Sequence, residues 1–273
     1  MRVHAVLGVT GAGKTSLATA AAHALGVPVV VADRIQCFRD IPVVSSRPSP
    51  DHRRVYLDDR TIPEGDLTAH QAYSRLRRIL GGLADRHRTV ILEGGSVSLL
   101  TMLFRDLPRL GFELHADVLP ARADSGDHAR RRILHALDRG LLAEFQRAWA
   151  HAGQRDFVRS IAGFDVLAEW CERQGSGPDE LARVTGAALA GIVDELVERS
   201  LSYTDRQAGA FRAAGVRPLG QGRDRCCRMV NTIRARSEGT SGEPGRNTYS
   251  RHGGVSYEIP HEVPHETPHE VRS

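Results

Sequence analysis

A glycine-rich run near the N-terminus constrains this chain more than any other feature. Residues 8–15 read Gly-Val-Thr-Gly-Ala-Gly-Lys-Thr and fit the pattern G-x-x-x-x-G-K-[ST] of a phosphate-binding loop. Lys14 is the only lysine among 37 lysine and arginine residues, so a compact ammonium occurs at this one position and planar guanidinium groups occur elsewhere. Such a loop requires a strand before it and a helix after it, because the helix N-terminus completes the anion site.

The residues around the loop predict that setting. An apolar run at 3–7 precedes it, and an alanine-rich helical pattern at 14–25 follows it and ends at Gly26. Two further apolar runs, at 29–32 and 89–92, predict strands that are buried on both faces. Buried strands that alternate with helices indicate a parallel sheet with helices on both sides. The expected fold class is therefore α/β, with a P-loop NTPase-like parallel sheet flanked by helices.

The second half of the chain is predicted to be helical. Helical patterns occur at residues 127–138, 141–152, 156–174 and 179–201. We therefore expect one domain at 1–219, with a sheet-forming core at 1–120 and a mostly helical part at 121–219. Residues 220–273 are rich in Gly, Ser, Arg and Pro and end in three Pro-His-Glu repeats, so we expect a disordered low-complexity tail. Three histidines at a period of four also suit a transition metal.

Composition narrows the class of protein further. The net charge of +4 suits an anionic ligand, and the aromatic content of 5% argues against a surface that stacks single-stranded bases. No apolar run approaches the roughly 18 residues of a membrane helix, and no signal peptide is recognisable. The four cysteines lack the spacing of a zinc site. We expect free thiols and a cytoplasmic protein without a membrane partner.

Polar side chains follow two of the predicted strands, where ligands bind in parallel sheets. Asp33 ends one strand, and its carboxylate suits a general base, a Mg²⁺ ligand or a cap of the next turn. Glu93 ends another strand where a Walker-B acid would lie, and Ser96 is placed to cap the following helix. Arg132 and Arg139 are seven residues apart on a helical stretch and therefore share one face. This face is either a solvated basic surface or a clamp for an anion. The loop itself suits a nucleoside triphosphate or another diphosphate, with Mg²⁺ on Thr15.

Five blocks, in order along residues 1–115, resemble the bacterial adenylate isopentenyltransferases, which begin cytokinin biosynthesis. The blocks are Gly8–Thr15, Asp33–Cys37, Ser46–Pro48, Arg54–Asp58 and Leu92–Leu100. The resemblance weakens after them but continues to about Arg212. It implies transfer of a dimethylallyl group from dimethylallyl diphosphate to the N6 amine of AMP, with release of diphosphate. The loop then holds the diphosphate of the prenyl donor, and the nucleotide is the acceptor.

The resemblance also implies roles for individual residues and a Mg²⁺ cofactor. Asp33 would remove a proton from N6, Thr10 would lie at the reacting centre, and Arg132 would stabilise the departing diphosphate. The implied diphosphate-binding residues are Gly11, Ala12, Gly13, Lys14, Thr15 and Ser16, with Thr15 as the metal ligand. The implied acceptor-binding residues are Asp33, Ser45, Arg47 and Ser96. Water must be excluded, because it would capture an allylic cation.

Two segments look more like the related tRNA dimethylallyltransferases. These are residues 138–144 and 203–207, which read Asp-Arg-Gly-Leu-Leu-Ala-Glu and Tyr-Thr-Asp-Arg-Gln. The stretch between residues 47 and 90, however, is short and leaves little room for the helical insertion with which those enzymes grip tRNA. We therefore expect AMP and dimethylallyl diphosphate as partners rather than tRNA. Two alternatives stay open: a tRNA adenosine dimethylallyltransferase and a P-loop small-molecule kinase.

Overall fold

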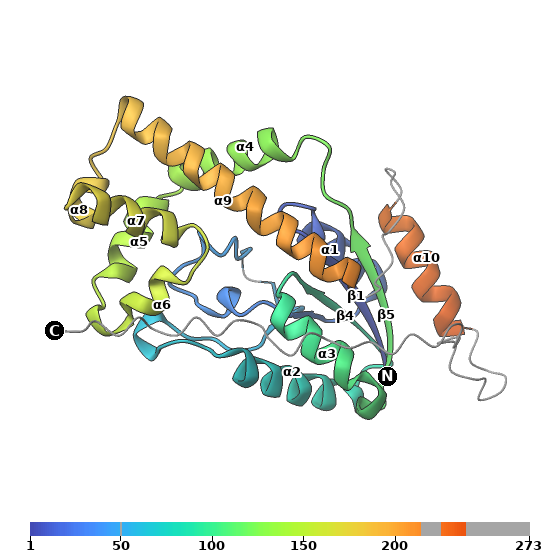
Figure 1. Ribbon diagram of the computed structural model, residues 1–273. Helices are drawn as coiled ribbons and strands as arrows, with labels where there is room; N and C mark the ends of the chain where they lie inside the picture. Colours follow the sequence, from blue (N-terminus) through green and yellow to red (C-terminus); the bar gives the residue numbers. More distant parts are fainter. Residues whose placement is uncertain (50, 214–224, 239–273) are drawn as a thin grey trace. The chain divides into compact units, whose positions relative to one another are not determined.

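A five-stranded parallel sheet forms the centre of the protein in a computed structural model, which describes residues 1–49, 51–213 and 225–238 (Figure 1). The strands are β1 (Arg2–Gly8), β2 (Val29–Val31), β3 (Arg54–Tyr56), β4 (Thr89–Gly94) and β5 (Glu113–Leu119). Their order in the sheet is β3-β2-β4-β1-β5, and every adjacent pair is parallel. The predicted fold class is confirmed.

Two of these strands, β3 and β5, were not predicted. β3 has three residues and lies at one edge of the sheet, and its sequence Arg-Val-Tyr carries no long apolar run. β5 lies at the other edge, and most of its side chains are only partly buried. Edge strands need less apolar sequence than central ones, because fewer elements cover them.

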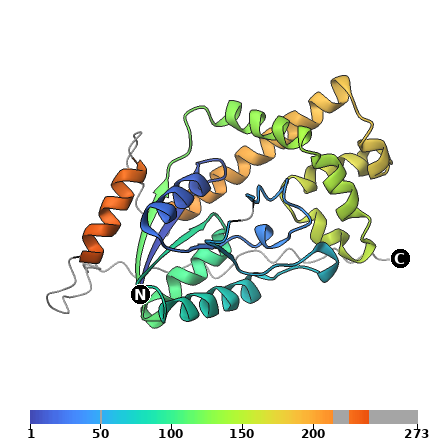
Figure 2. The same cartoon turned by 180° about the vertical axis from the view of Figure 1, so that it is seen from behind.

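Helices cover both faces of the sheet (Figures 1 and 2). On one face, α1 (Lys14–Leu25) and α10 (Arg225–Glu238) pack against Val29, Val31 and Ile91. On the other face, α2 (Ala69–Ala84) and α3 (Val97–Leu110) belong to the larger core, which contains Val30 and Leu92. Consecutive strand residues thus alternate between two cores, as the pleat requires. Both faces are buried, which explains why the central strands are apolar throughout.

The second half of the chain is helical, as predicted. Its helices are α4 (Ser125–Asp138), α5 (Leu141–Trp149), α6 (Arg155–Arg159), α7 (Phe164–Gln174), α8 (Pro178–Leu181) and α9 (Gly186–Ala213). The prediction of single helices over 156–174 and 179–201 was wrong. The first breaks before Gly163, whose φ of 98° is incompatible with a helix, and α9 begins only at Gly186.

Short 3₁₀ turns connect several of these elements: η1 (Ile35–Cys37), η2 (Ile62–Glu64) and η3 (Ala152–Gln154).

Residues 225–238, which were predicted to belong to the disordered low-complexity tail, instead form α10. Met229, Val230 and Ile233 give this helix an apolar stripe that is buried against the sheet. The remainder of the tail, with its Pro-His-Glu repeats, lies outside the described residues. Within the part of the chain that the structure describes, no helix is long and apolar enough to cross a bilayer.

Candidate active site

The glycine-rich loop connects β1 to α1, and two of its glycines are required by their surroundings. Gly8 has a φ of 146°, and a Cβ atom there would lie 2.8 Å from the carbonyl oxygen of Leu119. Gly11 has a φ of 79°, and a Cβ atom there would lie 3.1 Å from the ring of His128 and 3.2 Å from Arg132. The loop is therefore tightly enclosed by β5 and by α4, and it ends at the N-terminus of α1 as the motif predicts.

Not every amide of the loop is directed at an anion. The N–H of Ala12 closes a turn onto the carbonyl oxygen of Val9 at 3.2 Å. The N–H of Thr10 donates to Oε1 of Gln207 at 2.8 Å. Both residues were predicted to serve the reaction, and both use their amides to fix the loop. The first N–H groups of α1, at Lys14, Thr15 and Ser16, have no partner within a helix and remain oriented for an anion.

Lys14 extends back across the loop, where Nζ donates to the carbonyl oxygen of Val9 at 2.9 Å. Burial lowers the pKa of Lys14, the nearby carboxylates of Asp33 and Glu93 oppose this shift, and Arg132 adds to it. The ammonium is thus partly desolvated between two carboxylates and a guanidinium. A phosphate group would supply the additional negative charge that favours the protonated lysine.

Glu93 at the end of β4 is held by a buried ion pair with Arg54 of β3. The Arg54 guanidinium lies 3.3 Å from both carboxylate oxygens, and the two side chains are 1% and 2% exposed. Arg54 also donates to Thr19 of α1 at 2.7 Å. Thr15, the predicted metal ligand, donates its hydroxyl to Glu93 at 3.0 Å. Glu93 therefore anchors the loop and the neighbouring strand, in addition to lying where a Walker-B acid is expected.

Asp33 lies at the end of β2 and caps the η1 turn. Its Oδ1 accepts hydrogen bonds from the amides of Ile35 at 2.9 Å and Gln36 at 3.3 Å, which confirms the capping role. Within the described residues, Oδ2 has no hydrogen bond, so one oxygen is available to a ligand. Burial raises the pKa of Asp33, whereas the two amides and Lys14 oppose the shift. Burial and the Asp33 carboxylate also raise the pKa of Tyr203 on α9.

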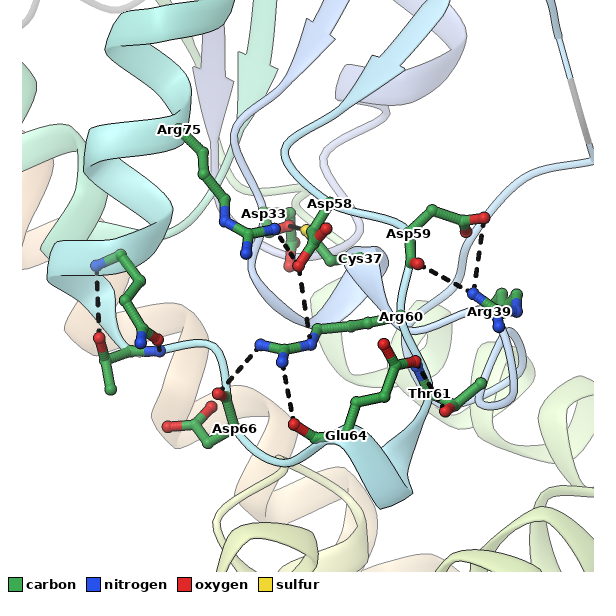
Figure 3. A network of polar contacts seen from close by, with 12 residues as sticks. Asp33, Cys37, Arg39, Asp58, Asp59, Arg60, Thr61, Glu64, Asp66 and Arg75 are labelled. Atoms are coloured by element: carbon green, nitrogen blue, oxygen red, sulfur yellow. Dashed lines mark hydrogen bonds and ion pairs between the residues drawn. The ribbon is translucent and has the colours of Figure 1, made fainter.

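A polar network borders Asp33 on the side of β3 (Figure 3). Asp58 pairs with Arg75 of α2 and lies 3.6 Å from Nε of Arg60. Cys37 lies next to Asp33, and its thiol donates to the Asp33 carbonyl oxygen at 3.4 Å. Burial raises the pKa of Cys37 to about 12, so this cysteine stays a thiol. Within this network, the Cys37 thiol is the group that binds the backbone of Asp33 directly.

Arg132 of α4 reaches the loop, as predicted. It lies beside Gly11 and donates to the hydroxyl of Ser46 at 3.4 Å, so it touches both the phosphate loop and the 41–47 segment. Arg130 pairs with Asp194, and Arg139 is exposed. Both side chains are exposed to solvent, as the alternative interpretation of a basic surface requires. A pocket next to the loop is lined by Thr10, Gly11, Arg122, His128 and Arg132, among others.

The predicted acceptor residues come from the 45–47 segment and from the start of α3. Ser45 donates its hydroxyl to the Ile41 carbonyl oxygen at 2.8 Å. Arg47 lies 4.0 Å over the ring of Tyr56 and donates to Asp59 at 3.3 Å, so its guanidinium is already engaged. Ser96 is the N-cap residue of α3, but its side chain makes no capping hydrogen bond, and its Oγ lies 3.5 Å from Oγ of Ser98.

Sequence reasoning missed two buried polar residues of the helical half. Glu144, which is 1% exposed, accepts hydrogen bonds from the amides of Val43 at 2.8 Å and Val44 at 2.7 Å. Gln207, which is 2% exposed, joins the phosphate loop to the carbonyl oxygen of Gly95. Both residues lie in the segments that look like tRNA enzymes, and that likeness was the only signal that pointed to them.

Fold and site together define a P-loop protein with a buried carboxylate and a basic helix beside the loop. The sequence model of the isopentenyl transferase family matches residues 1–220. The chain therefore belongs to the isopentenyl transferase family and is a prenyltransferase.

Similar proteins agree with this assignment. An adenylate dimethylallyltransferase from Rhodococcoides fascians is 36% identical over 231 residues, which cover 78% of this chain and 91% of the relative. Another from Ralstonia solanacearum is 30% identical, with 72% and 88% covered. The solved tRNA isopentenylpyrophosphate transferase from Bacillus halodurans has a TM-score of 0.69 at 17% identity, with 87% of this chain and 97% of that chain covered. The structural likeness supports the fold.

Proposed function

We propose that the protein transfers a dimethylallyl group from dimethylallyl diphosphate to the N6 amine of AMP, as the first step of cytokinin biosynthesis. The observation that carries the proposal is Asp33, whose partly buried carboxylate keeps one oxygen free of hydrogen bonds to the described residues beside the phosphate loop. A triphosphate-cleaving P-loop protein does not need a base that accepts a proton from an amine. The relatives named adenylate dimethylallyltransferase support AMP as the acceptor.

The proposed step breaks the C–O bond between the allyl group and diphosphate and forms a bond from the same carbon to N6. The N6 proton passes to Oδ2 of Asp33, and diphosphate leaves. A raised pKa makes the ionised Asp33 carboxylate a stronger base than an ordinary aspartate. Lys14 and Arg132 stabilise the charge that develops on the diphosphate. Thr10 lies at the reacting centre in this scheme.

Mg²⁺ is part of the proposal. Thr15 would hold it through the hydroxyl that now donates to Glu93, and an oxygen-rich setting of this kind suits the ion. When bound, Mg²⁺ would neutralise charge on the leaving diphosphate. A cytoplasmic location is also proposed, since Cys37, Cys171, Cys226 and Cys227 are all free thiols.

The test is an incubation of the full chain with AMP, dimethylallyl diphosphate and Mg²⁺, followed by mass spectrometry of the nucleotide. We expect an N6-prenylated AMP. Asp33→Asn should reduce turnover by about 10²-fold or more, the range of general-base catalysis, while Asp85→Asn on the exposed end of α2 should not. A folded protein that prenylates neither AMP, ADP nor ATP would refute the proposal.

Parallel reactions separate the alternatives. The fold similarity to tRNA prenyltransferases favours a second candidate, so an unmodified tRNA transcript is included with the same donor. Prenylation of the transcript without prenylation of AMP would replace the proposed acceptor by tRNA. Phosphate transfer from ATP without any prenyl donor would favour a kinase instead.

A further inference from the structure

We propose that Gln207 is a positioning residue that sets the distance between the donor loop and the acceptor side of the active site. Its amide lies between two backbone groups that follow neighbouring strands, one in the phosphate loop after β1 and one directly after β4. Oε1 accepts from the N–H of Thr10 at 2.8 Å, and Nε2 donates to the carbonyl oxygen of Gly95 at 2.7 Å. This inference rests on the proposed prenyl transfer, because it assigns Thr10 to the donor and the segment after Gly95 to the acceptor.

The orientation of the Gln207 amide is fixed by its partners. A backbone N–H needs an acceptor and a carbonyl oxygen needs a donor, so rotating the amide by half a turn would break both hydrogen bonds. The side chain is 2% exposed, and a buried amide that lost its partners would cost about 1–3 kcal/mol. Gln207 therefore holds both backbone groups firmly rather than following their motion.

The neighbouring residues of α9 keep the side chain in this place. Thr204, Gln207 and Phe211 are the buried residues in this part of the helix, and their spacing puts them on one face. Thr204 donates its own hydroxyl to the carbonyl oxygen of Ser200 at 2.9 Å, so it does not compete for the two groups that Gln207 binds. The helix thus holds the Gln207 amide on a buried face, while Tyr203 of the same helix lies near Asp33.

Gly95 shows how closely Gln207 fits. A Cβ atom at Gly95 would lie 2.8 Å from Nε2 of Gln207 and 3.5 Å from Nζ of Lys14. Because the amide is the end of a flexible side chain, it would move away from such a methyl group and lose at least one of its two hydrogen bonds. Gly95→Ala is therefore a way to displace Gln207 without changing it.

The expected consequence is a loss of alignment rather than of binding. The two hydrogen bonds of the Gln207 amide go to backbone groups and not to the side chains predicted to bind the substrates. Both substrates should therefore still bind to a variant at this position. A misplacement of about 1 Å between reacting groups can cost about 10²-fold in rate. Gln207→Met, which keeps the size of the side chain and removes both hydrogen bonds, should lower kcat by roughly 10–100-fold and change either KM by less than about threefold. Gln174→Met, at an exposed position on α7, is the matched control.

The experiment measures kcat and both KM values with AMP and dimethylallyl diphosphate, binding of inorganic diphosphate by calorimetry, and thermal unfolding. Wild-type activity first establishes that the proposed function holds, so its absence would count against that function alone. With active wild type, a fall in kcat for Gln207→Met with unchanged diphosphate affinity supports the positioning role. An unchanged kcat, or a loss explained entirely by diphosphate affinity, overturns it.

A double substitution tests the same idea independently of folding defects in one variant. If Gly95→Ala acts by displacing Gln207, then Gly95→Ala with Gln207→Met should be no more than about threefold slower than the slower single variant. Full multiplication of the two losses in kcat would mean that the two residues act separately, and would overturn the inference.

Discussion

Replacing Glu93 by glutamine would leave the Arg54 guanidinium buried without its counter-charge. The two side chains are 1% and 2% exposed and 3.3 Å apart, and glutamine has nearly the size of glutamate, so the substitution changes charge without opening a cavity. Breaking one side of a buried ion pair costs about 3–5 kcal/mol. For a domain of this size each kcal/mol lowers Tm by about 2–4 °C, so we expect a decrease of roughly 6–20 °C.

The assay is thermal unfolding followed by circular dichroism, together with urea unfolding at 25 °C. The matched control is Glu195→Gln, because Glu195 pairs with Arg173 at 2.7 Å but the two side chains are 43% and 47% exposed. An exposed pair contributes about 0–1 kcal/mol, so the control should change Tm by no more than about 4 °C. Glu93→Leu combined with Arg54→Met should recover stability, since replacing a whole buried pair by apolar groups is often neutral.

Equal effects of Glu93→Gln and Glu195→Gln on the free energy of unfolding would refute the reasoning. A double variant as unstable as Glu93→Gln alone would also contradict it. Either result would mean that the buried charge of Arg54 is not the source of the cost.

Two further predictions concern activity. Glu144→Ala should free the amides of Val43 and Val44 from the carboxylate that now binds them. We expect the KM for AMP to rise about tenfold, which is the effect of losing one hydrogen bond to a charged group. Unchanged steady-state kinetics would contradict this prediction. The pH range over which kcat/KM is high should be narrower than for an aspartate and a lysine with ordinary pKa values. Burial raises the pKa of Asp33 above its ordinary 3.8, so activity should fall on acidification at a higher pH than for an exposed aspartate. Burial lowers the pKa of Lys14 below 10.5, so activity should also fall early on the alkaline side. An acid limb near pH 4 would contradict the first of these signs.

The sequence predicted the part of the site that depends on local patterns. The loop before Lys14 has its own motif, and Asp33 directly follows an apolar strand, so both were identified and both lie at the carboxyl edge of the sheet. The sequence also predicted that Asp33 caps the turn that follows it, because aspartate is common in turns. Arg132 was chosen among several neighbouring arginines by resemblance alone.

What could not be predicted are the contacts made across long separations in the chain. Gln207 and Glu144 lie on helices whose patterns give no indication of the loops they bind, and their partners are backbone atoms, which carry no sequence signal. The breaks before Gly163 and Gly186 were missed because isolated glycines also occur inside helices. α10 was missed because its apolar stripe is short and lies in a polar, low-complexity segment.

The hydrogen bond between Thr10 and Gln207 also has a consequence for biosynthesis. The two residues are 197 positions apart. At about 5–20 residues per second, a ribosome needs roughly 10–40 s to add that length of chain. During this time the nascent loop has its complete motif but lacks the partner of one amide. The phosphate site therefore reaches its final form only after α9 has left the ribosome.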